Sequence, residues 1–112
     1  MGAAVVIVVE LRVEGQERPP AGSPVRVELR DTSYADAPAV TLASGTGRVA
    51  DDGDALARVE LEVDRVPDGT TVWAHVDVDG DGRVSSGDFI TMASWPVAQR
   101  VEARLPVGVR RV

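Results

Sequence analysis

The feature that most limits the fold of this chain is a two-residue alternation of apolar and charged side chains. In the segments 25–30, 58–64 and 72–79, every second residue is Val, Leu or Ala, and most of the residues between them are charged or polar. Successive side chains of a β-strand point to opposite faces, so this pattern predicts strands with one buried and one solvated face. Such strands are typical of antiparallel sheets. Weaker versions of the pattern at 5–13 and 101–105 predict two further strands.

The segments between these strands carry the residues of turns. GQERPPAGSP, DDGD and PDGT are rich in Pro, Gly and Asp, and no window of about 11 residues has a helical period. A chain of 112 residues is long enough to enclose one core, and no linker divides it. We therefore predict an all-β fold: a single domain over residues 1–112, formed by one antiparallel β-sandwich of about seven strands.

Composition excludes several classes of function. Without cysteine, the chain has neither disulfides nor thiolate metal sites. The net charge is −6, and the arginines alternate with acidic residues, so no nucleic-acid partner is expected. The run AAVVIVV is much shorter than the roughly 20 residues of a transmembrane segment and has no basic leader before it. If Met1 is the native start, we expect a cytoplasmic protein; a removed leader would place it in the cell envelope or outside the cell.

The segment DVDGDGRVSSGD, residues 77–88, has the ligand spacing of a calcium loop. Such a loop of 12 residues supplies oxygens from its positions 1, 3, 5, 7, 9 and 12, and glycine at position 6 makes the sharp turn. Gly82 is at position 6 here, and the last position carries Asp instead of Glu, as in dockerin modules, which the loop resembles. The alternative is a solvated acidic turn, like Asp51–Asp54. We predict a Ca²⁺ site with the metal ligands Asp77, Asp79, Asp81, Arg83 through its carbonyl, Ser85 and Asp88.

A longer pattern begins with an alternating strand followed by D-x-S-x-x-D-A-P-A, and RVPDGTTVWAHV, FIT and the pair Pro96-Val97 extend it. This pattern resembles the YbaY family of bacterial envelope lipoproteins, which is related to the YscW-type pilot chaperones of type III secretion, and D-x-S-x-x-D-A-P-A is its most specific part. The resemblance implies a compact β-sandwich and no enzymatic activity, and it brings no catalytic residues. Two departures are the missing lipobox cysteine and the acidic loop, because the family has a shorter turn there. The matching positions are Leu29, Asp31, Ser33, Ala35, Asp36, Ala37, Pro38 and Ala39.

Other residues have a plain structural explanation beside a functional one. We expect His75 to be an exposed strand residue and not the base of a nucleophile, and one or both of Trp73 and Trp95 to be packing residues and not a sugar platform. AAVVIVV is apolar on both faces, so a loop of the domain, a partner or a second copy of the chain should cover its second face. Phe89, Ile90 and Thr91 favour strand, so we predict that residues 88–95 form a strand antiparallel to 71–78.

Two functions fit these features. One is a calcium-stabilised binding or chaperone-like module with a protein or peptide partner, as a monomer or weak dimer. The other is a purely structural envelope domain whose calcium loop locks a hairpin.

Overall fold

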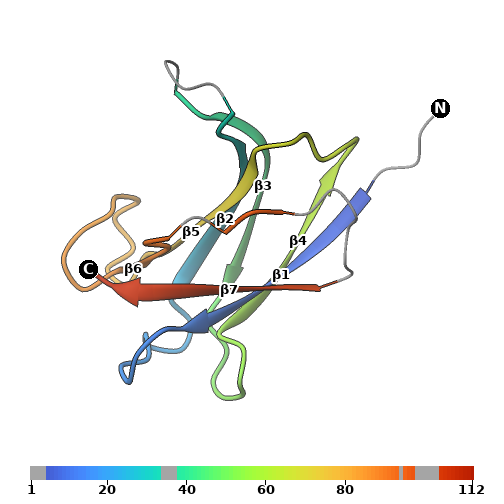
Figure 1. The fold of residues 1–112 in the computed structure, drawn as a ribbon. Coiled ribbons are helices and arrows are strands. Elements are labelled where there is room, and N and C mark those ends of the chain that lie inside the picture. The colour runs from blue at the N-terminus through green and yellow to red at the C-terminus, as the bar shows by residue number, and fades with distance from the viewer. Residues whose placement is uncertain (1–4, 34–37, 94, 98–103) are drawn as a thin grey trace.

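The computed structural model describes residues 5–33, 38–93, 95–97 and 104–112, and these residues form strands, turns and loops without a helix. Accordingly, the described part of the chain has no helix that is long and apolar enough to cross a membrane. Figure 1 shows the strands wrapped around a common interior. They are β1 (Val5–Val13), β2 (Pro24–Asp31), β3 (Val40–Arg48), β4 (Ala57–Val63), β5 (Thr70–Val76), β6 (Phe89–Ile90) and β7 (Arg104–Arg111).

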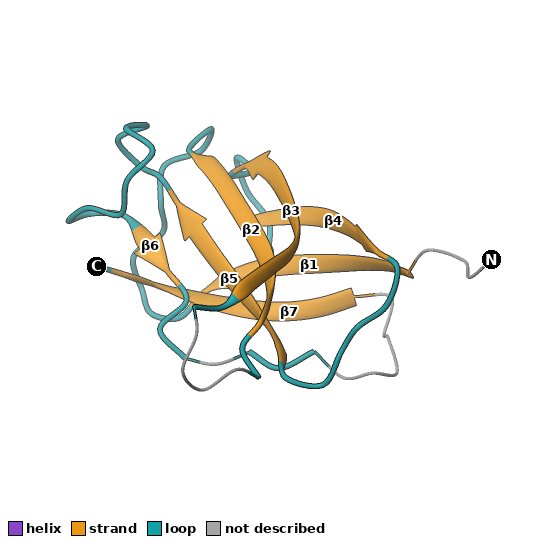
Figure 2. Ribbon diagram, turned by 90° about the horizontal axis from the view of Figure 1, so that it is seen from above, coloured by secondary structure: helices purple, strands orange, loops and turns teal. Residues whose placement is uncertain are grey.

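The seven strands follow one another in the order β3-β2-β5-β6-β7-β1-β4. The short strand β6 joins one half of the sheet to the other, so the molecule resembles a sandwich that is nearly closed into a barrel (Figure 2). The predicted all-β class is therefore confirmed. The sheet is mixed, however, because β7 runs parallel to β1, with Val9 opposite Leu105, while all other pairs are antiparallel. Alternation within a strand cannot reveal its direction relative to a neighbour, and this pair was missed for that reason.

The two ends of the strand order, β3 and β4, meet without forming a hydrogen-bonded ladder. Gly45 in β3 makes this close approach possible. A Cβ atom at Gly45 would lie 2.7 Å from Val59 Cγ1 and 2.9 Å from Leu61 Cδ2, both on β4. The seam between the two edges is thus packed by side chains of β4 against the bare backbone of β3.

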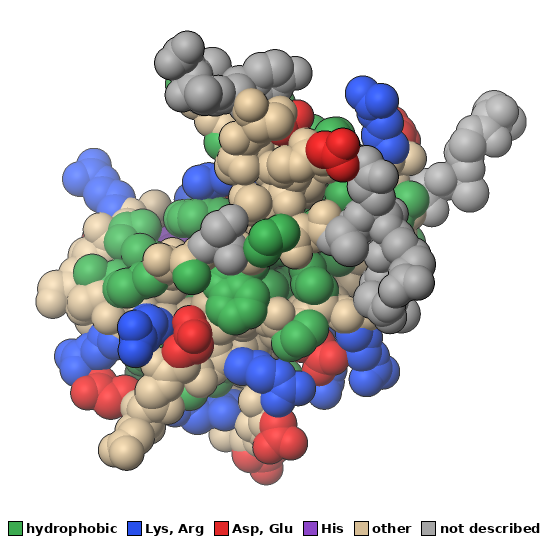
Figure 3. Space-filling view, viewed as in Figure 1, with side chains coloured by type: hydrophobic (Ala, Val, Ile, Leu, Met, Phe, Trp, Pro, Cys, Tyr) green, Lys and Arg blue, Asp and Glu red, His purple; other side chains and the backbone are tan. Residues whose placement is uncertain are grey.

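The alternation predicted from the sequence defines the core. In β2, Val25, Val27 and Leu29 are at most 2% exposed, whereas Arg26 on the opposite face is exposed. β4 follows the same rule over its whole length. Val6 of β1 stays 49% exposed, so the described residues leave part of the second face of this strand uncovered. Hydrophobic side chains also gather on the face crossed by β7, and charged side chains lie below them in the view of Figure 3.

The segment after the acidic loop only partly follows the prediction. Its pairing with β5 is antiparallel as expected, but the regular strand is limited to Phe89 and Ile90. From Thr91 to Val97 the described residues contact β5 through single backbone bonds, such as Thr91 N–H to Ala74 O (3.1 Å). Several residues of the predictions lie outside the described residues: Ala4, Ala35, Asp36 and Ala37, and Val101 and Ala103 of the last predicted strand.

Candidate functional site

The acidic loop, residues 77–88, connects β5 to β6 and projects from one end of the barrel (Figure 1). It is fixed at its base by backbone bonds to other segments. Asp77 N–H donates to Pro24 O (2.8 Å), and Val112 N–H donates to Asp88 O (2.7 Å). The first and last residues of the loop are therefore held by β2 and by the residue that follows β7.

Inside the loop, carboxylates turn inward and accept hydrogen bonds from the loop's own backbone. Gly82 N–H donates to Asp77 Oδ2 (2.7 Å), and Arg83 N–H donates to Asp81 Oδ1 (2.9 Å). Gly82 has φ of +78°, the left-handed conformation that a Cβ atom disfavours. This agrees with the expectation that position 6 of the loop needs glycine.

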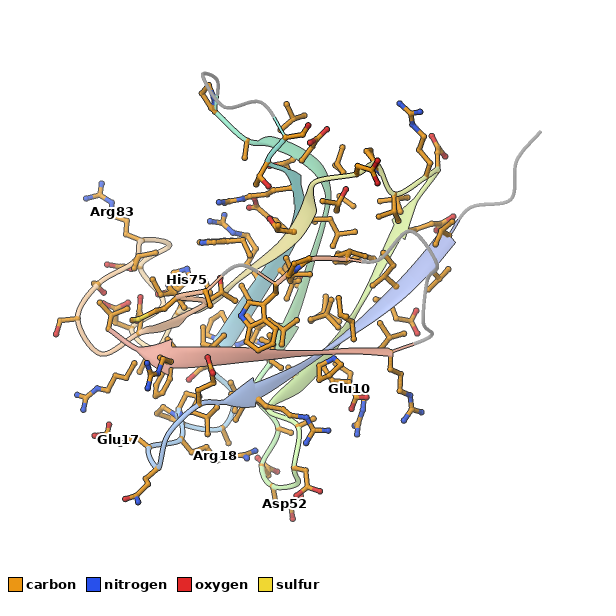
Figure 4. All side chains as sticks on the ribbon, viewed as in Figure 1. Glu10, Glu17, Arg18, Asp52, His75 and Arg83 are labelled. Atoms are coloured by element: carbon orange, nitrogen blue, oxygen red, sulfur yellow. The ribbon has the colours of Figure 1, made fainter. Side chains whose placement is uncertain are left out.

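Four of the predicted ligands meet in space. One carboxylate oxygen from each of Asp77, Asp79, Asp81 and Asp88 lies within 4.8 Å of the others. Asp77 and Asp88 are buried, while Asp79 and Asp81 are exposed. Ser85 joins the cluster because its hydroxyl donates to Asp79 Oδ2 (2.9 Å). For Arg83 the described contact is through its N–H, so its carbonyl as a ligand stays a prediction; its side chain points away from the loop in Figure 4.

One oxygen of this cluster lacks a donor. Asp77 is 9% exposed, and no donor among the described residues reaches its buried Oδ1. A buried carboxylate oxygen without a partner costs free energy, because it has lost water and gained nothing in return. Hard divalent cations bind such oxygens, so the oxygens of this cluster are of the type that Ca²⁺ prefers.

The cluster also shifts the pKa values of its members in opposite directions. The Ser85 hydroxyl, followed by hydrogen bonds from neighbours, lowers the pKa of Asp79. The Arg83 N–H lowers the pKa of Asp81, but burial and the Asp79 and Asp77 carboxylates outweigh it and raise that pKa above its ordinary value. The exposed rim of the loop therefore holds repelling negative charge, which a cation would relieve.

His75 was predicted to be an exposed strand residue, and this is wrong: it is 2% exposed. It lies at the base of the loop (Figure 4), and its Nε2 forms a 2.8 Å hydrogen bond with Asp88 Oδ2. Val78 N–H (2.9 Å) and Ser85 N–H (3.1 Å) also donate to the Asp88 carboxylate. Burial raises the pKa of Asp88, but these donors outweigh it and hold the pKa below its usual range.

In the sequence, His75 and Asp77 share a strand face, which places a carboxylate near the ring. The partner of the ring is Asp88, thirteen residues away, and the sequence pattern gave no signal for that contact.

The two tryptophans have different surroundings. Trp95 is half-buried and packs against the hydrophobic core, and its Nε1 has no partner among the described residues. Trp73 lies on the outer face of β5, between arginines of β2. Packing of Trp95 agrees with the prediction.

Comparison with known proteins gives one structural likeness. No family model matches the chain, and no curated protein matches it, so the YbaY-type resemblance stays a prediction. Among solved structures, the chain is similar to an alternative pilotin from the type II secretion system of Vibrio cholerae, with 25% sequence identity and a TM-score of 0.72. The match covers 98% of this chain and 98% of the pilotin.

Proposed function

We propose that this chain is a non-enzymatic binding module of the pilotin type, with a chaperone-like role toward a protein partner. The observation that carries this proposal is the full-length likeness to the Vibrio cholerae pilotin, at a TM-score of 0.72 over 98% of both chains. The match extends over the whole seven-stranded fold and not over one segment of it, so the likeness concerns the complete domain. The YbaY-type resemblance in the sequence supports the same class of protein.

We further propose that Ca²⁺ stabilises the module at the acidic loop. The support is local: inward carboxylates, the left-handed Gly82 and the partnerless Asp77 Oδ1. The ion would replace the missing donor and reduce the repulsion between carboxylates. The residues proposed to hold it are Asp77, Asp79, Asp81, Arg83 through its carbonyl, Ser85 and Asp88.

A second candidate function is favoured by the way the loop is tied down. Val112 N–H donates to Asp88 O, and Gly87 N–H donates to Val112 O (3.2 Å). The loop thus joins β5, β6 and the residue after β7. A structural domain whose calcium loop locks this junction would use the same contacts without any binding partner.

The metal proposal is tested by thermal unfolding in Ca²⁺ and in chelator. A ligand at about 100 times its Kd adds about 2.7 kcal/mol if only the folded state binds it. We expect a higher Tm in Ca²⁺ for the wild type and for Asp54→Ala, a matched control in the other acidic turn. Asp81→Ala should lose most of the increase. Equal Tm values for the wild type in both conditions would reject the metal.

The binding proposal is tested separately by affinity capture on the immobilised chain. A protein retained in stoichiometric amount, and released by excess free chain, is the expected result. If nothing is retained in either Ca²⁺ or chelator, the structural-domain alternative is favoured.

A further inference from the structure

The outer face of β2 and β5 carries an arrangement that the fold does not need. Alternation points Arg26, Glu28 and Arg30 of β2 away from the core, and pairing places Glu28 opposite Trp73 of β5. Outward-facing strand residues are usually solvated and independent of one another. Here they form one connected group.

Trp73 is held between two guanidinium groups. Arg30 Cζ lies 4.2 Å from the ring centroid, and Arg26 Cζ lies 5.4 Å from it. Both distances are within the ~6 Å range of cation–π attraction. The contact fixes two long side chains that would otherwise be mobile, so less entropy is lost when a ligand binds them.

The positive charge of this group is only partly neutralised. Arg30 Nε donates to Glu28 Oε1 (2.9 Å), and Arg26 Nε lies 3.5 Å from Glu28 Oε2. One carboxylate therefore serves two cations. Both contacts use Nε, and no acceptor among the described residues bonds the Nη groups of Arg26 or Arg30. Those groups keep the paired N–H donors that match a carboxylate.

A surface pocket lies at each end of the group. The first, of about 380 Å³, is lined by Arg30, Trp73 and Met92 together with threonine side chains. The second, also of about 380 Å³, is lined by Arg26 and by Arg48 of β3, whose Nη1 donates to Gly22 O, and by His75 and Asp77 at the base of the acidic loop. Each pocket thus combines an arginine with space for a side chain, and Trp73 lies between the two arginines.

We propose that this face of β2 and β5 binds an acidic segment of a partner polypeptide. Carboxylates of the segment would pair with the Nη groups of Arg30 and Arg26, and an apolar side chain between them would contact Trp73. The occupant follows from charge complementarity: the chain carries −6 overall, yet this face presents three arginines against two carboxylates, Glu28 and Asp77. The inference rests on the binding-module part of the proposed function, for which it names the surface and the partner class.

The test is fluorescence anisotropy with a labelled peptide of alternating Glu and Leu, at low salt and in chelator so that metal plays no part. We expect saturable binding, and a Kd at least tenfold weaker for Arg30→Gln, because charge-assisted hydrogen bonds contribute about that factor or more. Arg12→Gln is the matched control, since Arg12 is an exposed arginine of β1 in the other half of the sheet. It should bind like the wild type.

Two further measurements test whether the carboxylates of the peptide and the arginines of this face make the binding contacts. A peptide with Gln in place of Glu should bind at least tenfold more weakly, and Arg26→Gln should repeat the effect of Arg30→Gln if the latter unfolds. An unchanged Kd in folded Arg30→Gln and Arg26→Gln, or equal binding of both peptides, would overturn the inference. Such a result would leave the binding module itself open, because affinity capture tests it without reference to this face.

Discussion

Closure of the barrel depends on Gly45, and the substitution Gly45→Ala should show how much stability the close contact with β4 requires. In Gly45→Ala the new Cβ atom would meet Val59 Cγ1 at 2.7 Å, Leu61 Cδ2 at 2.9 Å and the Glu60 carbonyl oxygen at 3.2 Å. Val59 and Leu61 are buried, so neither side chain has free space to move into. Overpacking of this kind costs about 1–3 kcal/mol. The substitution also gains roughly 0.5–1 kcal/mol, because alanine loses less backbone entropy than glycine in a strand.

Comparison with Gly47→Ala separates the steric overlap of the new Cβ atom with β4 from the gain in backbone entropy. Gly47 lies two residues further along β3, where a Cβ atom would meet Val59 Cγ2 at an ordinary 3.4 Å. Both variants share the backbone effect, so their difference in unfolding free energy should be the overlap, about 1–3 kcal/mol. For a domain of this size that is a Tm difference of about 4–12 °C, measured by thermal unfolding followed by circular dichroism.

Equal Tm values for the two variants would refute the packed seam. β3 and β4 would then be open edges, and strand addition by a partner would compete with the face of β2 and β5 as a binding mode.

Two other predictions concern single residues. Gly82→Val should make the free energy of Ca²⁺ binding, measured by calorimetry, about 1–2 kcal/mol less favourable, because it strains the left-handed turn without removing a ligand. Unchanged affinity would show that the loop does not wind this way around an ion. Hydrogen bonds from the Ser33 hydroxyl and N–H lower the pKa of Asp31, so its ionised form stabilises the fold above the ordinary carboxyl pKa, and that contribution is lost as pH falls through the folded-state value. The stability gap between wild type and Asp31→Asn in urea unfolding should therefore close below about pH 4, and a gap that persists at lower pH would contradict the assignment.

Much of the fold could be predicted because strand burial is a local property. The alternation in residues 25–30 and 58–64 identifies β2 and β4 and the face that each buries. The loop at 77–88 was also predictable, since ligand spacing and the glycine at its sixth position are local. Its carboxylates converge, as the spacing predicts.

The missed features all depend on contacts between distant segments. The burial of His75 requires the loop to fold back so that Asp88, thirteen residues away, reaches its ring. The strand predicted over 88–95 is short because only Phe89 and Ile90 lie between β5 and β7; beyond them the chain meets β5 irregularly. The arginine pair around Trp73 depends on the register of β2 with β5, which neither strand encodes alone.

The central position of β7 has a consequence for how the chain folds. β7 fills the place between β1 and β6, and its pairing joins Val8 to Arg104, almost a whole chain length apart. Loops of that length make strand pairing slow compared with local contacts. Until β7 docks, β1 is an open edge with the exposed apolar Val6 on it, the kind of edge that pairs with other chains. During synthesis this protein should therefore be most prone to aggregation after β1–β4 have emerged and before β7 has.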